Sequence, residues 1–402
     1  MNKKLDLHIC EFNLALFLRA IILLSPVMLL FYQENGLSVK ELFFFQGIFY
    51  LTSILAEFPV GYISDIISRK KVLLISLAIY IGINLMWLVG HGYFIILLGE
   101  ILFGLSKVMM DNAMSGYLYD YLSSKNKKDD MVKFYGYLNF FLALGTAVAA
   151  LIGTFLYTKF GSKTVLIAET FIILTSYILM SFVPNFKPHT EKFQQFKKQI
   201  VEFARTTISI SKNKNLKYYI LYSGLLTALS ILFALSFQPL MQNALVPVAM
   251  FGLIAFCNHG TRALAGIFAG KWLRNFDIQK LVVPLFALYI LGFGIIFKTF
   301  TCKSTVATIS LLVLICIIIG IQLMFTILHV SRLHKFVTIN ERGNLLAVNN
   351  FISRTFAAIT LITSRLFLDK MGLIQFFEVT LAVFVIFGLY IVFKITKTGE
   401  KA

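Results

Sequence analysis

Apolar segments of membrane-spanning length follow one another along the whole chain. Each holds roughly 20 residues, enough at about 1.5 Å per residue to cross the hydrocarbon core of a bilayer. Hydrophobic residues make up 58% of the 402 residues and charged residues only 14%, more apolar surface than a soluble domain of this size can bury. We therefore predict an all-α membrane protein with about twelve transmembrane helices, near 10–32, 41–64, 71–90, 93–119, 134–157, 163–183, 218–238, 246–270, 279–298, 305–329, 343–366 and 373–394.

Basic residues predict the direction in which these segments cross. The net charge of +18 could suggest a nucleic-acid partner, but the lysines and arginines lie mainly between apolar runs, where the positive-inside rule places them. They gather on the inner side if both termini are cytoplasmic. We therefore predict that both termini are cytoplasmic. We expect a multi-pass protein of the bacterial cytoplasmic (inner) membrane, with the lipid bilayer and not nucleic acid as its partner. The first apolar run lacks a small-residue cleavage site, so we expect a retained helix.

Cysteines and short motifs give no indication of an enzyme or a metal site. The four cysteines are scattered without paired spacing. The stretch GIFAGK, Gly266 to Lys271, is superficially like a phosphate-binding loop, but it is one residue short and Trp272 follows it. Its glycines fit a helix-packing face better. We expect no enzymatic activity, no cofactor and no metal.

The two halves of the chain repeat each other without a gap. The longest polar segment, 184–217, divides them, which predicts an N-terminal six-helix bundle over 1–183 and a C-terminal six-helix bundle over 218–402. Parallel repeats of this kind relate the halves of some transporters. A shift of 205 positions superimposes four identical pairs, Gln33 on Gln238, Gly47 on Gly252, Gly61 on Gly266 and Arg69 on Arg274.

The segment between the halves carries a helical pattern of its own. Phe193, Phe196, Ile200 and Phe203 recur at helical spacing with lysines between them. One interpretation is an amphipathic helix that lies on the inner leaflet of the membrane. The other is a solvated connector with some helix, and the sequence leaves both open.

The stretch LAEFPVGYISDIISRKKVLLIS, 55–76, predicts a tight hairpin between the second and third spanning helices. An apolar run ends on Asp65, and basic residues from Arg69 onward precede the next run. Gly61 would let another helix approach closely. The spacing Gly-x-x-x-Asp-x-x-x-Arg-Lys resembles the loop 2–3 signature of the Major Facilitator Superfamily, whose fold has twelve helices in two pseudo-symmetric halves.

That resemblance implies roles for the residues of the hairpin. In the family, the aspartate that matches Asp65 caps the start of helix 11 in one conformation and pairs with a nearby arginine. Ile66 and Ser68 depart from the family pattern, which usually has a basic residue and a glycine there. The resemblance thus implies a conformational-switch motif made of Gly61, Asp65, Arg69 and Lys70.

Other stretches narrow the resemblance within the superfamily. LAEFPVGYISD and the later SGYLYDYL are similar to bacterial multidrug or metabolite permeases, although Met114 and Ser115 stand where that group frequently has acidic residues. The fifth helix loosely matches the glycine pattern of family antiporters through Gly145 and Gly153. Alanines replace the central Gly-Pro of that pattern, and the glycines that remain favour export.

Charged residues within the spanning helices are functional candidates, because each is costly in hydrocarbon unless it faces a cavity or a partner. Glu169 in the sixth helix is one such residue. The candidates for proton coupling or substrate binding are Arg19, Glu57, Glu100, Lys107, Asp111, Arg262 and Arg354.

The fourth helix is the most informative of these. One face of this helix carries three charged residues, Glu100, Lys107 and Asp111. At about 100° per residue, they lie within roughly 50° of one line along the helix. Since helices 1, 4, 7 and 10 line the central cavity in this superfamily, the face could line it, or Lys107 and Asp111 could form a purely structural ion pair.

The remaining charges also leave alternatives open. Glu57 and Arg262 occupy equivalent positions in the two halves and could face each other, or Glu57 could pair with Arg354. A buried carboxylate can load and release a proton, but one held by arginine stays ionised. Glu57 and Asp111 are therefore both coupling candidates.

These features favour a secondary transporter, acting as a monomer, that exports a small organic molecule such as a drug or metabolite by alternating access against protons. The runner-up keeps the fold and reverses the direction: a proton-coupled uptake symporter for a small solute that could be an anion. A third hypothesis is a receptor or scaffold that uses the transporter fold without transport.

Overall fold

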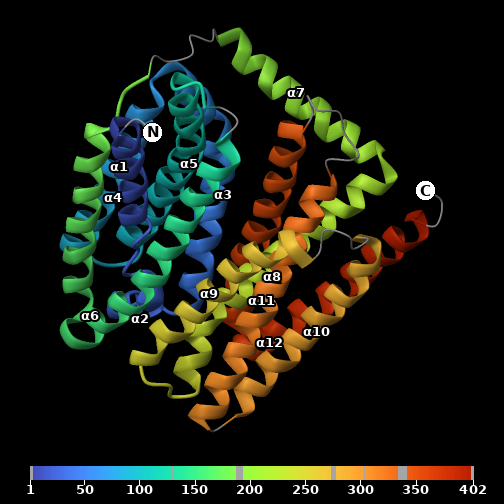
Figure 1. Ribbon diagram of the computed structural model, residues 1–402. Helices are drawn as coiled ribbons and strands as arrows, with labels where there is room; N and C mark the ends of the chain where they lie inside the picture. The colour runs from blue at the N-terminus through green and yellow to red at the C-terminus, as the bar shows by residue number, and fades with distance from the viewer. Residues whose placement is uncertain are drawn as a thin grey trace. The chain divides into compact units, whose positions relative to one another are not determined.

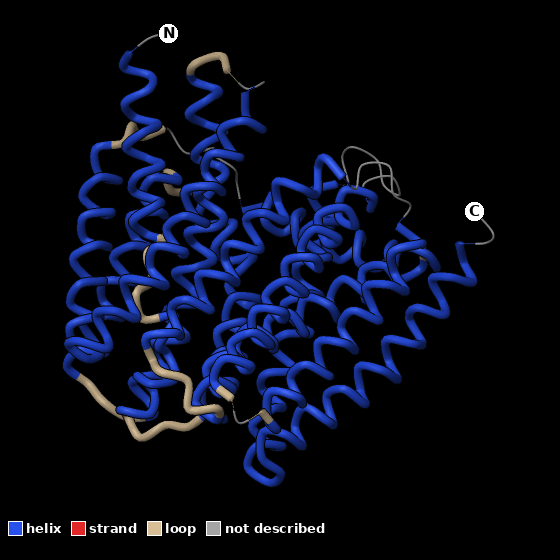
Figure 2. The backbone as a smooth tube through the Cα atoms, turned by 60° about the horizontal axis from the view of Figure 1, so that its bottom comes forward, coloured by secondary structure: helices blue, strands red, loops and turns tan. Residues whose placement is uncertain are grey.

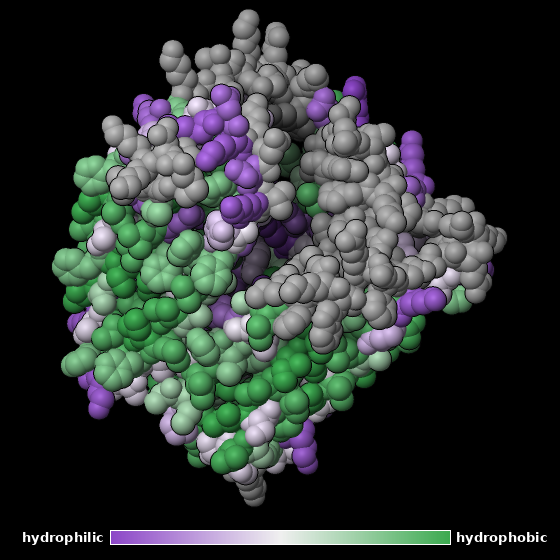
Figure 3. Space-filling view, viewed as in Figure 1, coloured by the Kyte–Doolittle hydropathy of each residue, from purple (hydrophilic) through white to green (hydrophobic). Residues whose placement is uncertain are grey.

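The computed structural model describes residues 3–127, 130–186, 193–272, 278–302, 304–333 and 342–399, and within these ranges it is helical with no strand (Figure 2). The side chains of some helical residues, Asp65 among them, lie outside the description. Apolar side chains cover much of the face in Figure 3 that is not grey. Many large ones are strongly exposed, including Phe94 and Val89, as expected for contact with lipid.

The first spanning segment is broken, whereas we predicted one continuous helix over 10–32. Helix α1 (Lys3–Arg19) ends well before the short 3₁₀ helix η1 (Ser25–Val27), and α2 (Met28–Glu34) follows directly. Pro26 explains the break, because it has no amide hydrogen and its ring excludes the carbonyl four residues earlier. The chain crosses the gap in tight turns, with the Ile22 amide donating to the Ala20 carbonyl at 3.0 Å.

The hairpin predicted near Asp65 is present. Helix α3 (Val39–Ile66) is followed by α4 (Arg69–Val89), with only two residues between them. Helix α5 (Tyr93–Ser124) then packs along α4, and their apolar side chains join those of α1 in one buried core.

Two very long helices each contain a sharp reversal. In α6 (Met131–Phe182) the interruption is Gly161, with φ 79°, and in α12 (Arg342–Gly399) it is Gly372, with φ 77°. Only glycine adopts this left-handed conformation freely. The glycine divides each long helix into two parts, and these parts coincide with the predicted segments on either side of it.

The remaining helices complete the chain. In the part that the structure describes, eight helices are long and apolar enough to span a membrane, with α6 and α12 each counted once. Helix α9 and the broken first segment are not among the eight, so the number of crossings stays a prediction. The further helices are α7 (Phe193–Lys212), which is the helix predicted between the halves, α8 (Lys214–Asn243), α9 (Ala249–Trp272), α10 (Ile278–Thr301) and α11 (Thr305–Leu333).

The helices of Figure 1 form two compact units. The first comprises Met1–Ser38, Leu51–Phe196 and Val248–Phe256, and the second comprises Val39–Tyr50, Lys197–Pro247 and Cys257–Ala402. The start of α3 therefore belongs with the second unit and the start of α9 with the first. We call Val39–Tyr50 and Val248–Phe256 the exchanged segments, because each belongs with the unit formed mainly by the other half of the chain. The two segments nearly coincide under the 205-position shift, so their exchange follows the internal repeat.

The repeated glycines Gly47 and Gly252 lie where the exchanged segments cross their neighbours. A Cβ atom placed on Gly47 would lie 2.8 Å from the Ile362 amide nitrogen of α12. One on Gly252 would lie 2.3 Å from the Ala150 carbonyl oxygen of α6. Both distances are too short for any side chain, so close backbone approach explains why glycine recurs at this position.

Candidate substrate and coupling site

Arg19 lies at the end of α1, where the helix breaks inside the first unit. Its side chain is only 4% exposed. The guanidinium carbon lies 4.2 Å from the centre of the Tyr80 ring of α4 and 5.7 Å from that of Phe103 of α5. The ring faces and the negative end of the α1 dipole both favour a cation at this position.

Glu169 of α6 is the acidic counterpart of Arg19. It is 1% exposed, and its Oε1 atom accepts hydrogen bonds from the Tyr80 hydroxyl at 2.7 Å and from Asn84 Nδ2 at 3.3 Å. Its Oε2 atom accepts the Leu24 amide hydrogen at 2.9 Å. Leu24 immediately precedes η1, so the carboxylate binds backbone that the helix break would otherwise leave without a partner. The sequence marked Glu169 only as an intramembrane charge, because its partners lie on other helices.

One edge of the Arg19 guanidinium is unsatisfied. Nε and Nη2 have no hydrogen-bond partner among the residues that the structure describes. Together these atoms form an edge that can hold the two oxygens of a carboxylate side by side. Asp111 and Glu169 lie within electrostatic reach of the guanidinium, but Asp111 is bonded to Lys107 and Glu169 to Leu24, Tyr80 and Asn84.

Lys107 and Asp111 of α5 form an ion pair one helical turn apart. Their side chains are 46% and 33% exposed, whereas Glu100 on the same face is fully buried and accepts the Tyr32 hydroxyl hydrogen at 2.6 Å. The charged face predicted on this helix is therefore accessible at Lys107 and Asp111 and buried at Glu100. The ion pair is the contact that the structural alternative requires, and a role for this face in lining a cavity stays a prediction.

The basic residues of the hairpin connect α4 to two other helices of the first unit. Arg69 Nη1 donates to the Gly116 carbonyl at 2.7 Å and to Asp120 Oδ1 at 2.9 Å, both on α5. Lys70 Nζ donates to the Ser181 carbonyl at 2.6 Å, near the end of α6, where the helix dipole favours a cation. The turn is thus fixed to α5 and α6 by charge-assisted bonds.

The other two residues of the predicted switch motif are less informative. No described atom lies within 4 Å of a Cβ placed on Gly61, so the close approach expected there is not found in the described part of the chain. The Asp65 side chain and residues 334–341, which lead into α12, lie outside that part. The capping role implied for Asp65 stays a prediction.

Arg262 of α9 and Arg354 of α12 both belong to the second unit. Both act electrostatically on the Tyr50 hydroxyl, and Arg262 also acts on Tyr289 of α10. Arg262 is exposed and Arg354 is half-buried. Glu57 is half-buried in the first unit, and its pairing with either arginine stays a prediction.

A short polar network surrounds Tyr289 in the second unit. The Tyr289 and Ser230 hydroxyls are hydrogen-bonded, and Ser230 donates to Gln322 Oε1 at 2.7 Å. Gln322 Nε2 donates in turn to Thr326 Oγ1 at 2.8 Å. Helices α8, α10 and α11 each contribute to this network, which no sequence motif predicted.

Two residues that bind the hairpin were also missed from the sequence. Gly116 and Asp120 are one turn apart in SGYLYDYL, so both can face one side chain of α4, and this spacing was the available signal. Gly116 leaves room for the Arg69 guanidinium, since a Cβ there would lie 2.6 Å from its Nε. Tyr117 is a core residue that stacks on Phe12 with ring centres 4.8 Å apart.

Comparisons with known proteins identify the family of the chain. The family model described as Major Facilitator Superfamily matches residues 12–361. The quinolone resistance protein NorA of Staphylococcus aureus is 25% identical over 156 residues, which span 39% of this chain and 39% of NorA.

Solved structures share the fold at low sequence identity. The nucleoside transporter NupG, in a point-mutant form, superimposes with a TM-score of 0.82 at 14% identity, covering 98% of this chain and 99% of NupG. A bacterial homologue of the human lysosomal transporter Spinster, inward-facing and unoccupied, gives a TM-score of 0.73 at 14% identity, covering 100% of this chain and 98% of the homologue.

Proposed function

Since the chain belongs to the Major Facilitator Superfamily, a family of transporters, we propose that it is a secondary active transporter that exports a small organic molecule in exchange for protons. The observation that carries the proposal is the juxtaposition of Arg19, Lys107 and Asp111 in the first unit. Arg19 is buried with an unsatisfied edge, and the neighbouring Lys107–Asp111 pair is accessible. Charges within spanning helices are costly unless they face a partner or a water-filled cavity, and such charges mark the paths of solutes and protons.

Asp111 is the proposed coupling carboxylate. Ionised, it neutralises Lys107 and attracts Arg19. In this form it also accepts a hydrogen-bond donor of the substrate, whereas a proton on Asp111 removes that acceptor charge. Because this carboxylate carries either the proton or the substrate, competition between them is sufficient for exchange. Protonation also weakens the hold of Asp111 on both cations, and an anionic group that then binds them moves together with the proton, as in uptake. Glu57 is the second acidic candidate for this role.

The proposed direction of transport rests on two resemblances. A quinolone resistance protein matches this chain over 156 residues, which favours a drug or metabolite as cargo and export as direction. Gly145 and Gly153 loosely match the antiporter pattern of the fifth helix, although the structure gives them a packing role as well. They lie against the Phe17 and Leu23 carbonyls beside the break in the first helix.

Uptake of an anionic solute together with protons is the second candidate. The unsatisfied Nε–Nη2 edge of Arg19 favours it, because a substrate carboxylate would complete that edge. The structural likeness to a nucleoside transporter is compatible with either direction, since it reflects the fold alone.

Transport into inverted membrane vesicles tests the proposal. We expect an imposed pH gradient to drive accumulation of at least one compound from a panel of dyes, drugs and metabolites, and the purified protein to release protons when that compound is added. Accumulation driven only by the opposite gradient would support uptake. Binding without transport or proton release would instead indicate a receptor or scaffold.

The proposal also includes the surroundings of the protein. We propose a monomer in the bacterial cytoplasmic membrane with twelve crossings, cytoplasmic termini and two alternating bundles. Helix α7 would lie on the inner leaflet, because its apolar and basic residues occupy different faces. Labelling of single introduced cysteines at the C-terminus, in intact cells and in inverted vesicles, tests this orientation.

A further inference from the structure

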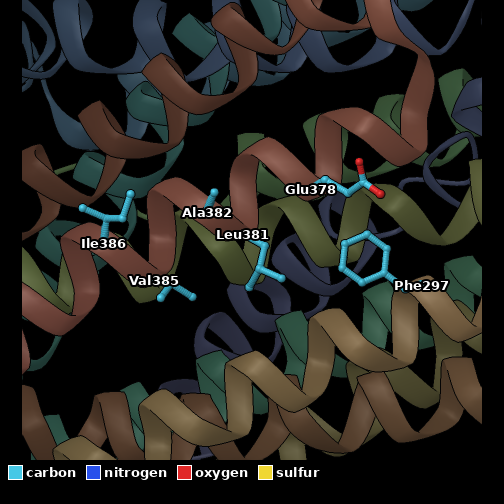
Figure 4. A pocket seen from close by; sticks show the side chains of 6 residues that line it. All are labelled: Phe297, Glu378, Leu381, Ala382, Val385 and Ile386. Carbon is cyan, nitrogen blue, oxygen red and sulfur yellow. The ribbon is translucent and has the colours of Figure 1, made fainter.

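A groove runs along the outer surface of the second unit between α10 and α12. Its volume is about 380 Å³ and its lining is almost wholly apolar. Figure 4 shows the lining side chains of α12 in a row, with Glu378 at one end near Phe297 of α10. The groove is lined by Phe297, Glu378, Leu381, Ala382, Val385 and Ile386.

Glu378 is unusual among these residues because it places a carboxylate on a membrane-spanning surface. It is exposed and lies within the apolar stretch Leu345–Lys397. It follows the Gly372 interruption by six residues, so it is roughly 9 Å from that end of the spanning segment at 1.5 Å per residue. This depth is close to the boundary between headgroups and acyl chains.

No ion pair or hydrogen bond joins Glu378 to another residue in the described ranges. Lys298 follows Phe297 in the sequence of α10, and it forms no described ion pair with Glu378. A carboxylate at the edge of the hydrocarbon needs a cation or donor to offset the cost of leaving water. The groove beside it offers apolar surface that suits an acyl chain.

The two features together select a class of amphiphile. A cationic group is attracted to Glu378, and an apolar chain bound to the same group fits the groove. A primary ammonium donates up to three charge-assisted hydrogen bonds to a carboxylate, whereas a quaternary choline has no N–H to donate. The site should therefore distinguish ethanolamine from choline headgroups.

We propose that the groove binds a phospholipid with a primary ammonium headgroup, phosphatidylethanolamine, with the ammonium on Glu378 and an acyl chain along Leu381, Val385 and Ile386. The proposal depends only on the second unit and is independent of the substrate, coupling ion and direction of transport.

Lipid retention in a defined mixture tests this site. The full-length protein is reconstituted in nanodiscs of equal parts phosphatidylethanolamine and phosphatidylcholine with matched chains, released into mild detergent, and its bound lipids are counted by native mass spectrometry. We expect the wild type to retain phosphatidylethanolamine at least threefold over phosphatidylcholine. Glu378→Gln, which keeps the shape and removes the charge, should bring the ratio close to one.

Two further variants separate the parts of the site. Ala382→Trp should fill the groove and lower retention of both lipids without changing the charge. Lys298→Gln removes a cation of α10 that forms no described ion pair with Glu378, so it should leave the preference unchanged. Equal retention of the two lipids by the wild type, or an unchanged preference in Glu378→Gln, would overturn the proposal. If Glu378→Gln does not yield monodisperse protein, undiminished retention by Ala382→Trp overturns it.

Discussion

Glu169→Gln should destabilise the first unit far more than an isosteric change normally does. The glutamate accepts three hydrogen bonds through two oxygens, one of them from the Leu24 amide at the helix break. Glutamine has a single acceptor oxygen, so if that oxygen keeps the Tyr80 and Asn84 bonds, its amide group faces the Leu24 donor. A lost bond to a charged group costs about 1.5–3 kcal/mol, and an unsatisfied buried amide adds about 1–3 kcal/mol. We expect a loss of about 3–5 kcal/mol, similar to removing one partner of a buried charge pair.

Thermal unfolding of the purified protein in detergent measures this loss. For a unit of roughly 200 residues, it corresponds to a decrease in apparent Tm on the order of 10 °C. Arg19→Met removes the cation that Glu169 compensates, so the double variant should lose less than the sum of the two single variants, by about 1–3 kcal/mol. An unchanged Tm in Glu169→Gln would show that the carboxylate does not hold the helix break. Strictly additive losses in the double variant would show that it does not compensate Arg19.

Two glycines give predictions with matched controls. Gly116→Ala places a methyl group 2.6 Å from Arg69 Nε and should displace that guanidinium, costing about 2 kcal/mol of stability and slowing transport. Gly82→Ala in α4 is the control, since no described atom lies within 4 Å of the new Cβ, and it should be neutral or stabilise the protein slightly. Equal Tm shifts in Gly116→Ala and Gly82→Ala would contradict the claim that Gly116 makes room for Arg69. Gly252→Leu should reduce the yield of monodisperse protein because its Cβ would lie 2.3 Å from a carbonyl oxygen. Gly260→Leu, whose Cβ would have no described atom within 4 Å, should express normally. Normal yield and transport in Gly252→Leu would refute close backbone approach at this crossing.

Much of the fold could be predicted from the sequence because spanning helices are specified locally by length and hydropathy. The repeat even identified Gly47 and Gly252, whose common cause is a close helix crossing. The break in the first helix was missed although Pro26 signalled it, because the apolar run continues through the proline and hydropathy does not register the lost backbone bond.

The candidate site was less predictable, because its contacts join residues distant in sequence. Arg19 and Asp111 were both identified as charges within spanning helices, and the structure brings them within electrostatic reach. Two partners of Glu169 lie on α4, and the third is the Leu24 backbone amide, whose availability depends on the missed helix break. The sequence pattern therefore locates the charged residues within the helices. It does not predict the hydrogen bonds that decide the role of each charge.

Gradient-driven transport by Asp111→Asn tests the coupling claim most directly. In reconstituted vesicles, the account predicts that this variant binds substrate with much weaker pH dependence and does not use a proton gradient, while exchange of substrate for substrate persists. If Asp111 only neutralises Lys107, Asp111→Asn should instead express poorly, and Lys107→Met combined with Asp111→Leu should restore normal gradient-driven transport. That restoration would contradict the coupling role of Asp111 and leave Glu57 as the acidic candidate to test.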